Sequence, residues 1–155
     1  MSGLRAVEIR RRISAPVAEV FQWWTTAELM QLWMSPTGAV TATVDLRVGG
    51  SFRVVMEGEG FIIEHVGEFI EIDEPRRLVF TWSSPYTGPK ASVVTVELEP
   101  DGRRATQVLI VHSELPDSVA DSHGGGWTAM LARLDEVIAR ARTSASAEGG
   151  KVHGD

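Results

Sequence analysis

A histidine followed by three glycines, at residues 123–126, has residue types that can do chemistry. In lipases and esterases such a stretch forms an oxyanion hole, and it works with a nucleophilic serine in a G-x-S-x-G turn between a strand and a helix. The nearest match, GGSFR at residues 49–53, lacks the final glycine and leads into a predicted strand. We therefore expect the glycines to let the chain approach the sheet and turn into a helix that Trp127 begins.

Histidines and glutamates are also candidate metal ligands here. The candidates are His65, His112, His123, Glu64, Glu68 and Glu114. None of them has the close spacing, as in H-E-x-x-H, that fixes two ligands on one face of a helix. We predict no metal site, and the sequence implies no other cofactor.

His112 is the candidate for proton transfer. It ends an apolar strand and shares one alternating face with Thr106, Val108 and Ile110. If that face points inward, His112 lies at the rim of the space under the last helix. A hydrogen-bonded structural residue and a ligand-binding or proton-handling residue both fit that position.

Aromatic residues are numerous for so short a chain. Five tryptophans and five phenylalanines occur among 155 residues. Each one is explained by core packing, and together they suit a curved sheet and a helix that enclose an apolar pocket.

Composition restricts the classes of protein. The chain carries 15 Lys and Arg against 21 Asp and Glu, a formal net charge of −6, and it has no basic block. An acidic chain of this kind is a poor ligand for nucleic acid. The absence of cysteine excludes disulfides, and no apolar run is long enough for a signal peptide or a membrane span. We expect a soluble cytoplasmic protein with no nucleic-acid or membrane partner.

The hydrophobic pattern predicts the elements that position these residues. Alternation over residues 6–13 indicates a strand, and helical spacing over residues 14–34 indicates two short helices. Residues 39–113 read as successive β-strands separated by glycine and proline turns. The stretch that begins at Trp127 has one apolar face and one charged face, so it predicts a long amphipathic helix.

These elements predict an α+β domain over residues 1–142. The expected order is one strand, two short helices, six strands and a long C-terminal helix packed across a curved antiparallel sheet. Residues 143–155 are small, polar and glycine-rich. We expect them to form a disordered tail.

Several blocks of the sequence resemble a known family. The paired glycines of DLRVGGSFRVVMEGEG, the block DEPRRLVFTW and the late GW of HGGGWTAMLARLDEVI occur in an order similar to that of bacterial relatives of the activator of heat-shock-protein-90 ATPase. The resemblance covers about residues 7–139. It implies membership of the START-like, SRPBCC superfamily and the helix-grip fold of the birch-pollen allergen. It also implies a cavity between the sheet and the helix.

Function follows less directly, because this superfamily includes carriers, receptors, cyclases and chaperone regulators. We expect a binding protein for a small apolar or aromatic ligand rather than an enzyme. One alternative is a polyketide cyclase or aromatase that uses His112, Glu114 or Glu57 for proton transfer. The other is a chaperone ATPase regulator or a different protein-interaction module.

Regular alternation predicts the residues that bind the ligand. Aromatic and aliphatic side chains would supply apolar area, and His112 and Arg53 would orient a polar group. The full set is Trp24, Trp33, Phe52, Arg53, Phe80, Trp82, Val94, Val96, Ile110, His112, Trp127, Met130 and Leu134. On the opposite face, Leu109, Val111 and Val93 leave a homodimer contact open.

Overall fold

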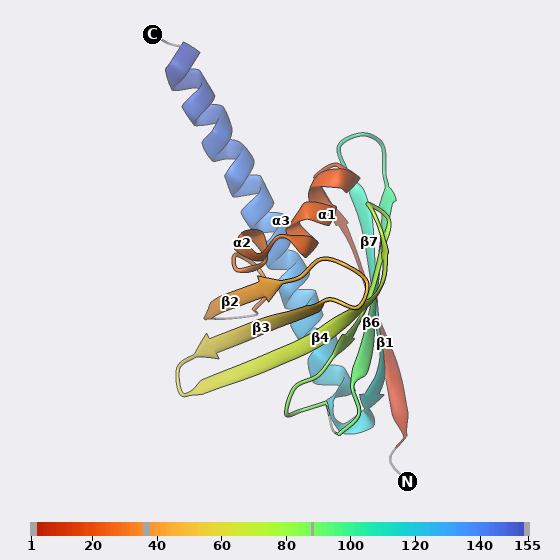
Figure 1. The fold of residues 1–155 in the computed structure, drawn as a ribbon. Helices are drawn as coiled ribbons and strands as arrows, with labels where there is room; N and C mark the ends of the chain where they lie inside the picture. The colour runs from red at the N-terminus through yellow and green to blue at the C-terminus, as the bar shows by residue number, and fades with distance from the viewer. Residues whose placement is uncertain (1–2, 36–37, 88, 154–155) are drawn as a thin grey trace.

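A computed structural model describes residues 3–35, 38–87 and 89–153 of the chain. The described residues form one sheet and three helices (Figure 1). In chain order the elements are β1 (Leu4–Ile13), α1 (Val17–Thr25), α2 (Ala27–Met30), β2 (Ala39–Val44), β3 (Ser51–Gly58), β4 (Phe61–Asp73), β5 (Arg77–Trp82), β6 (Ser92–Pro100), β7 (Thr106–Pro116) and α3 (Asp117–His153).

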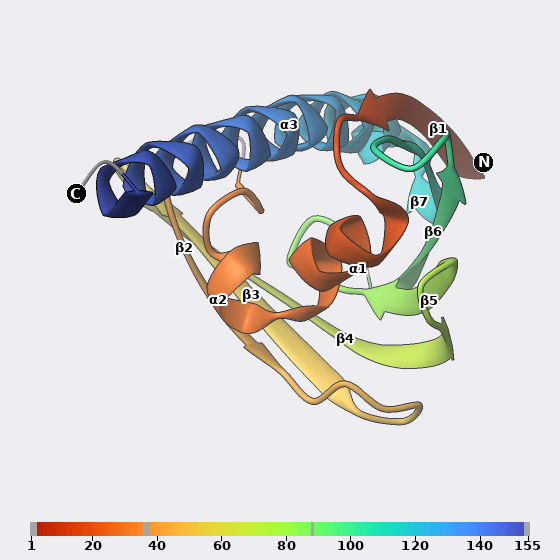
Figure 2. The ribbon, with the colours of Figure 1, turned by 90° about the horizontal axis from the view of Figure 1, so that it is seen from above.

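The seven strands form one antiparallel sheet in the order β1-β7-β6-β5-β4-β3-β2. Six strands follow the chain from neighbour to neighbour, while β1 pairs with β7 at the far edge. The sheet curves, with α3 along its open side and α1 and α2 inside the curve (Figure 2). The predicted α+β helix-grip fold is confirmed.

Alternation along the strands determines which side chains reach the core. In β6 the buried residues are Ser92, Val94, Val96 and Leu98, and the residues between them are less buried. The register then sets Val94 opposite His112 and Val96 opposite Ile110 of β7. These side chains share one face of the sheet because successive residues of a strand point to opposite faces. That face is the concave one, against which α3 packs.

The start of α3 differs from the sequence prediction. The helix begins at Asp117, ten residues before Trp127, so Gly124, Gly125 and Gly126 lie inside it. Contacts made before the glycines explain the difference. Leu115 and Ala120 are fully buried there. Their burial and the ion pairs of the first turns outweigh the low helix propensity of glycine.

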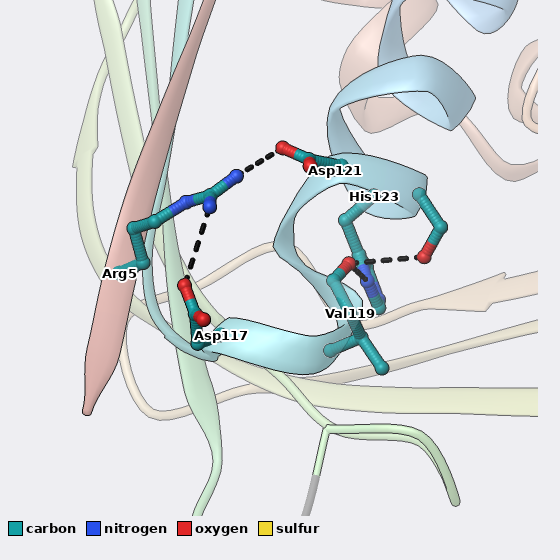
Figure 3. Close-up of polar contacts among 6 residues, drawn as sticks. Arg5, Asp117, Val119, Asp121 and His123 are labelled. Atoms are coloured by element: carbon teal, nitrogen blue, oxygen red, sulfur yellow. Dashed lines mark hydrogen bonds and ion pairs between the residues drawn. The ribbon is translucent and has the colours of Figure 1, made fainter. Parts of the chain in front are cut away.

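An arginine of β1 anchors these first turns. Arg5 donates a hydrogen bond to Asp117 Oδ1 at 3.2 Å and a second one to Asp121, as Figure 3 shows. Both carboxylates lie in the first two turns of α3, where the helix dipole favours negative charge. The pairing therefore joins the beginning of α3 to the edge strand of the sheet.

At its other end the helical backbone of α3 continues to His153. It thus passes residue 142, where the sequence analysis places the domain boundary, and that boundary and the disordered tail stay predictions. No helix among the described residues is both long and apolar enough to span a membrane.

Replacement of Gly125 by alanine is expected to stabilise the fold. A Cβ at this exposed helical position would meet no atom within 4 Å. Alanine favours a helix interior over glycine by about 1 kcal/mol, so the free energy of unfolding should rise by about that amount in urea denaturation. The control is Gly67→Ala in β4, where a Cβ would overlap the backbone oxygen of Thr81 and lower the stability. A destabilised Gly125→Ala protein would contradict the assignment of this stretch to α3.

Candidate functional site

A cavity of about 350 Å³ lies between the sheet and the N-terminal half of α3. Its walls come from β3, β4, β5 and α3, and the loop after β5 contributes Tyr86. The lining residues are Ser35, Met56, Phe61, Ile63, His65, Trp82, Tyr86, Val119, Ser122, His123, Gly126, Trp127 and Met130. None of these described residues is Asp, Glu, Lys or Arg. The cavity is therefore apolar with a few neutral polar groups, which is the usual composition of a small-molecule site.

Tryptophan side chains form the inner end of the cavity. Trp127 of α3 lies against Trp82 of β5, with ring centroids 5.3 Å apart, and stacks on Trp24 of α1 at 5.8 Å. All three are at least 98 % buried. Because Trp127 is held from two sides, its remaining surface faces the cavity in a fixed orientation.

His112 connects β6, β7 and α3 beneath this wall. Its Nδ1 accepts a hydrogen bond from Trp127 Nε1 at 2.9 Å, and its Nε2 lies 2.7 Å from Ser92 Oγ. The Ser92 hydroxyl donates its proton to the Trp82 carbonyl at 2.6 Å. It must therefore accept from His112 Nε2, which identifies the neutral Nε2–H tautomer of the imidazole.

The buried network keeps His112 uncharged. Burial, with smaller contributions from His123 and His65, lowers the pKa of His112 from 6.5 to about 3. Both ring nitrogens are already in hydrogen bonds, and the residue is fully buried. Both nitrogens are thus engaged in this arrangement, which is what the hydrogen-bonded alternative of the sequence analysis expects, and a role of His112 toward a ligand stays a prediction.

His65 of β4 is the first of two histidines on the cavity wall. Its ring packs on Trp82 with centroids 4.6 Å apart, and the residue is 6 % exposed. Burial lowers its pKa to about 4, so it is neutral at pH 7. Its Nδ1 is buried with no hydrogen-bond partner among the described residues. A buried polar atom without a partner costs stability, which is a feature that binding sites often show.

His123 of α3 is the second histidine on the wall. Its Nδ1 donates to the Val119 carbonyl at 2.9 Å, one helical turn earlier (Figure 3). Its ring stands perpendicular to that of His112, with centroids 5.2 Å apart. The orientation of His123 is thus set by the backbone of α3 on one side and by the buried network on the other.

The structure separates the predicted ligand-binding residues into three groups. Trp82, Trp127 and Met130 line the cavity. Trp24, Phe52 and Phe80 surround a void of only about 10 Å³ beside it, where side chains fill the concave face. Buried elsewhere in the core are Trp33, Val94, Val96, Ile110, His112 and Leu134.

Arg53 lies apart from all of these. Its side chain is mostly exposed and pairs with Glu64 of β4 on the outer face of the sheet. It lies there because its strand neighbours Phe52 and Val54 point into the core. Arg53 therefore cannot orient a ligand in this cavity. Glu57 is exposed as well, and Glu114 pairs with Lys90, so neither lines the cavity.

Other lining residues were missed in the sequence, although two signals point to them. His65 shares the inward alternation of Phe69 in β4. Val119, Ser122, His123 and Gly126 fall at the i, i+3, i+4 and i+7 positions of one helical face. The second signal was hidden because the helix was expected to begin at Trp127.

The position of the glycines also decides the oxyanion question. Residues 124–126 are helical, so their backbone N–H groups belong to the hydrogen-bond ladder of α3 and do not converge on a substrate oxygen. Among the described residues, no three His, Asp or Glu side chains gather closely enough to hold a metal ion.

Comparison with known proteins gives one family and many similar structures. The sequence model described as Activator of Hsp90 ATPase homolog 1-like protein matches residues 14–139. An HSP90 activator from Plasmodium falciparum is 26 % identical, with a TM-score of 0.73 over 86 % of this chain and 96 % of that one. CalU16 from Micromonospora echinospora is 28 % identical, with a TM-score of 0.68 over 96 % and 85 %.

A protein from Nitrosomonas europaea is 23 % identical, covers 89 % of this chain and 96 % of its own, and superposes with a TM-score of 0.75. At that identity the likeness concerns the fold alone. Among curated proteins, no sequence is similar enough to this chain to count as a match.

Replacement of His112 by leucine is expected to lower the free energy of unfolding by about 2–4 kcal/mol. The change leaves the buried Trp127 N–H without an acceptor and removes the bond to Ser92. Urea denaturation of His112→Leu, Trp127→Phe and the double variant gives the coupling between the two residues. A coupling of at least about 1 kcal/mol is expected, and additive losses would show that the bond contributes nothing specific.

Stability is expected to fall on mild acidification. Below pH 6.5 the unfolded chain protonates His65 and His112, whereas the folded chain does so only near pH 4 and pH 3. The stabilisation is therefore complete above pH 6.5 and is lost as the pH falls toward 4. Where both histidines titrate in the unfolded state alone, the slope of the free energy of unfolding against pH approaches about 2.7 kcal/mol per pH unit. Urea denaturation between pH 7.5 and 5 measures it, and His65→Leu should show about half the slope. An equal slope in the two proteins would refute the assignment to His65.

Proposed function

The chain belongs to the family of Activator of Hsp90 ATPase homolog 1-like proteins, and we propose that it binds a small apolar or aromatic molecule in the cavity between the sheet and α3. The observation that carries the proposal is an apolar-walled space of about 350 Å³ on the concave face of the sheet. This volume lies at the lower end of the range for small-molecule sites. A compact ligand of one or two rings suits it better than a long lipid.

The walls support an aromatic occupant. Trp82, Trp127 and His65 present rings whose orientations are fixed by neighbouring side chains, so little side-chain entropy is lost when a flat molecule packs on them. The rim carries the exposed aromatic residues Phe61 and Tyr86. Exposed aromatic groups beside an apolar cavity favour the first contact of a ligand with the protein.

A second candidate function is regulation of a chaperone ATPase. The HSP90 activator from Plasmodium falciparum supports it, since that protein is similar over 96 % of its own length. The ATPase rate of purified Hsp90, measured with and without this chain, separates the two functions. A homodimer through Leu109 and Val111 and a cytoplasmic location stay predictions.

Filling the cavity is expected to weaken binding without loss of the fold. Gly126 lines the cavity, and a Cβ there would meet no atom within 4 Å, so the side chain of Gly126→Leu would occupy the space of the ligand. The measurement is the fluorescence gain of N-phenyl-1-naphthylamine, an uncharged apolar probe, on titration with protein. The unaltered chain should enhance the emission, and Gly126→Leu should weaken binding by roughly tenfold or more.

The matched control is Gly125→Leu. It makes the same chemical change one residue away, at an exposed position that does not line the cavity. Its binding should equal that of the unaltered chain. Equal binding in Gly126→Leu, or no binding of the probe by the unaltered chain, would contradict a ligand site in this cavity.

A further inference from the structure

The polar groups of the cavity limit the chemistry of its ligand. The described lining residues include no Asp, Glu, Lys or Arg, so an anion or cation enclosed there would lose its hydration without a carboxylate, ammonium or guanidinium partner. Such a loss costs several kcal/mol for an ionised group in an apolar site. The cavity therefore disfavours carboxylates and protonated amines. An uncharged molecule does not carry this penalty.

One hydrogen-bond acceptor in the wall is set in a single orientation. Because a carbonyl oxygen can only accept, the bond from His123 to Val119 puts a proton on Nδ1, so an imidazole with a single proton has its lone pair on Nε2. The Nε2 atom then carries a lone pair, and no hydrogen bond to it is made by the described residues. A ligand that meets this atom has to bring its own donor.

Other polar groups of the wall are engaged or buried, and His65 Nδ1, which has no partner among the described residues, is a fully buried atom. Ser122, the adjacent lining residue, donates its hydroxyl proton to the same Val119 carbonyl at 3.0 Å, which leaves its oxygen able to accept but gives a ligand no donor. His112 behind the wall has both nitrogens engaged by Ser92 and Trp127. Since burial keeps His65 neutral, it brings no positive charge at pH 7 that would attract an anion.

We propose that the cavity selects an uncharged aromatic molecule with a hydroxyl group, and that the hydroxyl donates its hydrogen bond to Nε2 of His123. The rings of Trp82 and Trp127 supply the apolar contact, and His123 supplies the specificity. This inference rests on the proposed binding function and adds the ligand class and the residue that recognises it.

Three naphthalene derivatives of similar size test the proposal. At pH 7.5, 2-naphthol is an uncharged donor, 2-methylnaphthalene has no donor and 2-naphthoate is an anion. The dissociation constants are measured from the shifts of backbone amide signals in NMR titrations of the full chain. 2-Naphthol should bind about fivefold to tenfold more tightly than 2-methylnaphthalene, the value of one net hydrogen bond. 2-Naphthoate should bind more weakly than either.

His123→Leu identifies the acceptor. This variant should lose the preference for 2-naphthol while it still binds 2-methylnaphthalene, because leucine removes the acceptor and keeps an apolar side chain on the wall. The control is Tyr86→Phe. It removes the tyrosine hydroxyl at the rim of the cavity and should keep the full preference. A preference that survives in His123→Leu would overturn the role of this residue.

The failure of the inference is distinct from the failure of the proposed function. Equal binding of 2-naphthol and 2-methylnaphthalene, or tighter binding of 2-naphthoate, would overturn the selectivity and leave an apolar site in place. If none of the three binds and N-phenyl-1-naphthylamine also fails to bind, the site itself is refuted, and the inference with it.

Discussion

The hydrogen bond from Trp127 to His112 determines where α3 rests on the sheet. It lies in a core that is otherwise almost wholly apolar, where side chains of similar volume could slide past one another at small cost. A shift of the helix would leave the buried Trp127 N–H without its acceptor, His112 Nδ1, and an unpaired buried donor costs about 1–3 kcal/mol. Ser92 extends the restraint to β6 by completing the hydrogen bonding of the imidazole. The helix, two central strands and one tryptophan ring are thus held in a single register.

This restraint divides the concave face into a filled part and an open part. On one side of Trp127, the rings of Trp24, Phe52 and Phe80 leave a void smaller than a ligand. On the other side, α3 carries glycine and small residues toward β4, and the space between them stays open. Trp127 thus forms the border between a packed core and an open cavity, and its ring belongs to both.

Much of the fold was readable in the sequence, because each element has its own signal. Alternation in β6 and β7 showed the inward residues, and the apolar face of α3 showed how it packs. The family resemblance is confirmed by the match over residues 14–139. The start of α3 could not be predicted from the sequence, because three glycines outweigh any local helix signal. The first turns are stabilised by the ion pair with Arg5 of β1 and by the burial of Ala120, and both depend on parts of the chain that are distant in sequence.

The site was readable only in part. Alternation along a strand shows which face of the sheet a side chain lies on, but it does not show which side chains of the helices pack against it. Val94, Ile110 and Leu134 point inward as predicted and meet other side chains there. His65 also points inward, but the stretch of α3 opposite it is short of side-chain volume, so it faces the cavity. That difference depends on the summed side-chain volume of several elements that meet in space. The hydrophobic pattern of the sequence does not give that sum.

The three glycines inside α3 have a consequence for how the protein opens. Glycine has a low helix propensity, and it has no side chain to shield the backbone hydrogen bonds from solvent. Local unfolding of the helix therefore costs least at these three residues. The turns before them carry Val119, Ser122 and His123, which form one wall of the cavity. The amide protons of that wall are therefore expected to exchange with solvent through local fluctuations, while those of the packed turns from Met130 to Ile138 exchange only when the whole domain unfolds. The weakest part of the longest helix thus coincides with the boundary between the cavity and solvent.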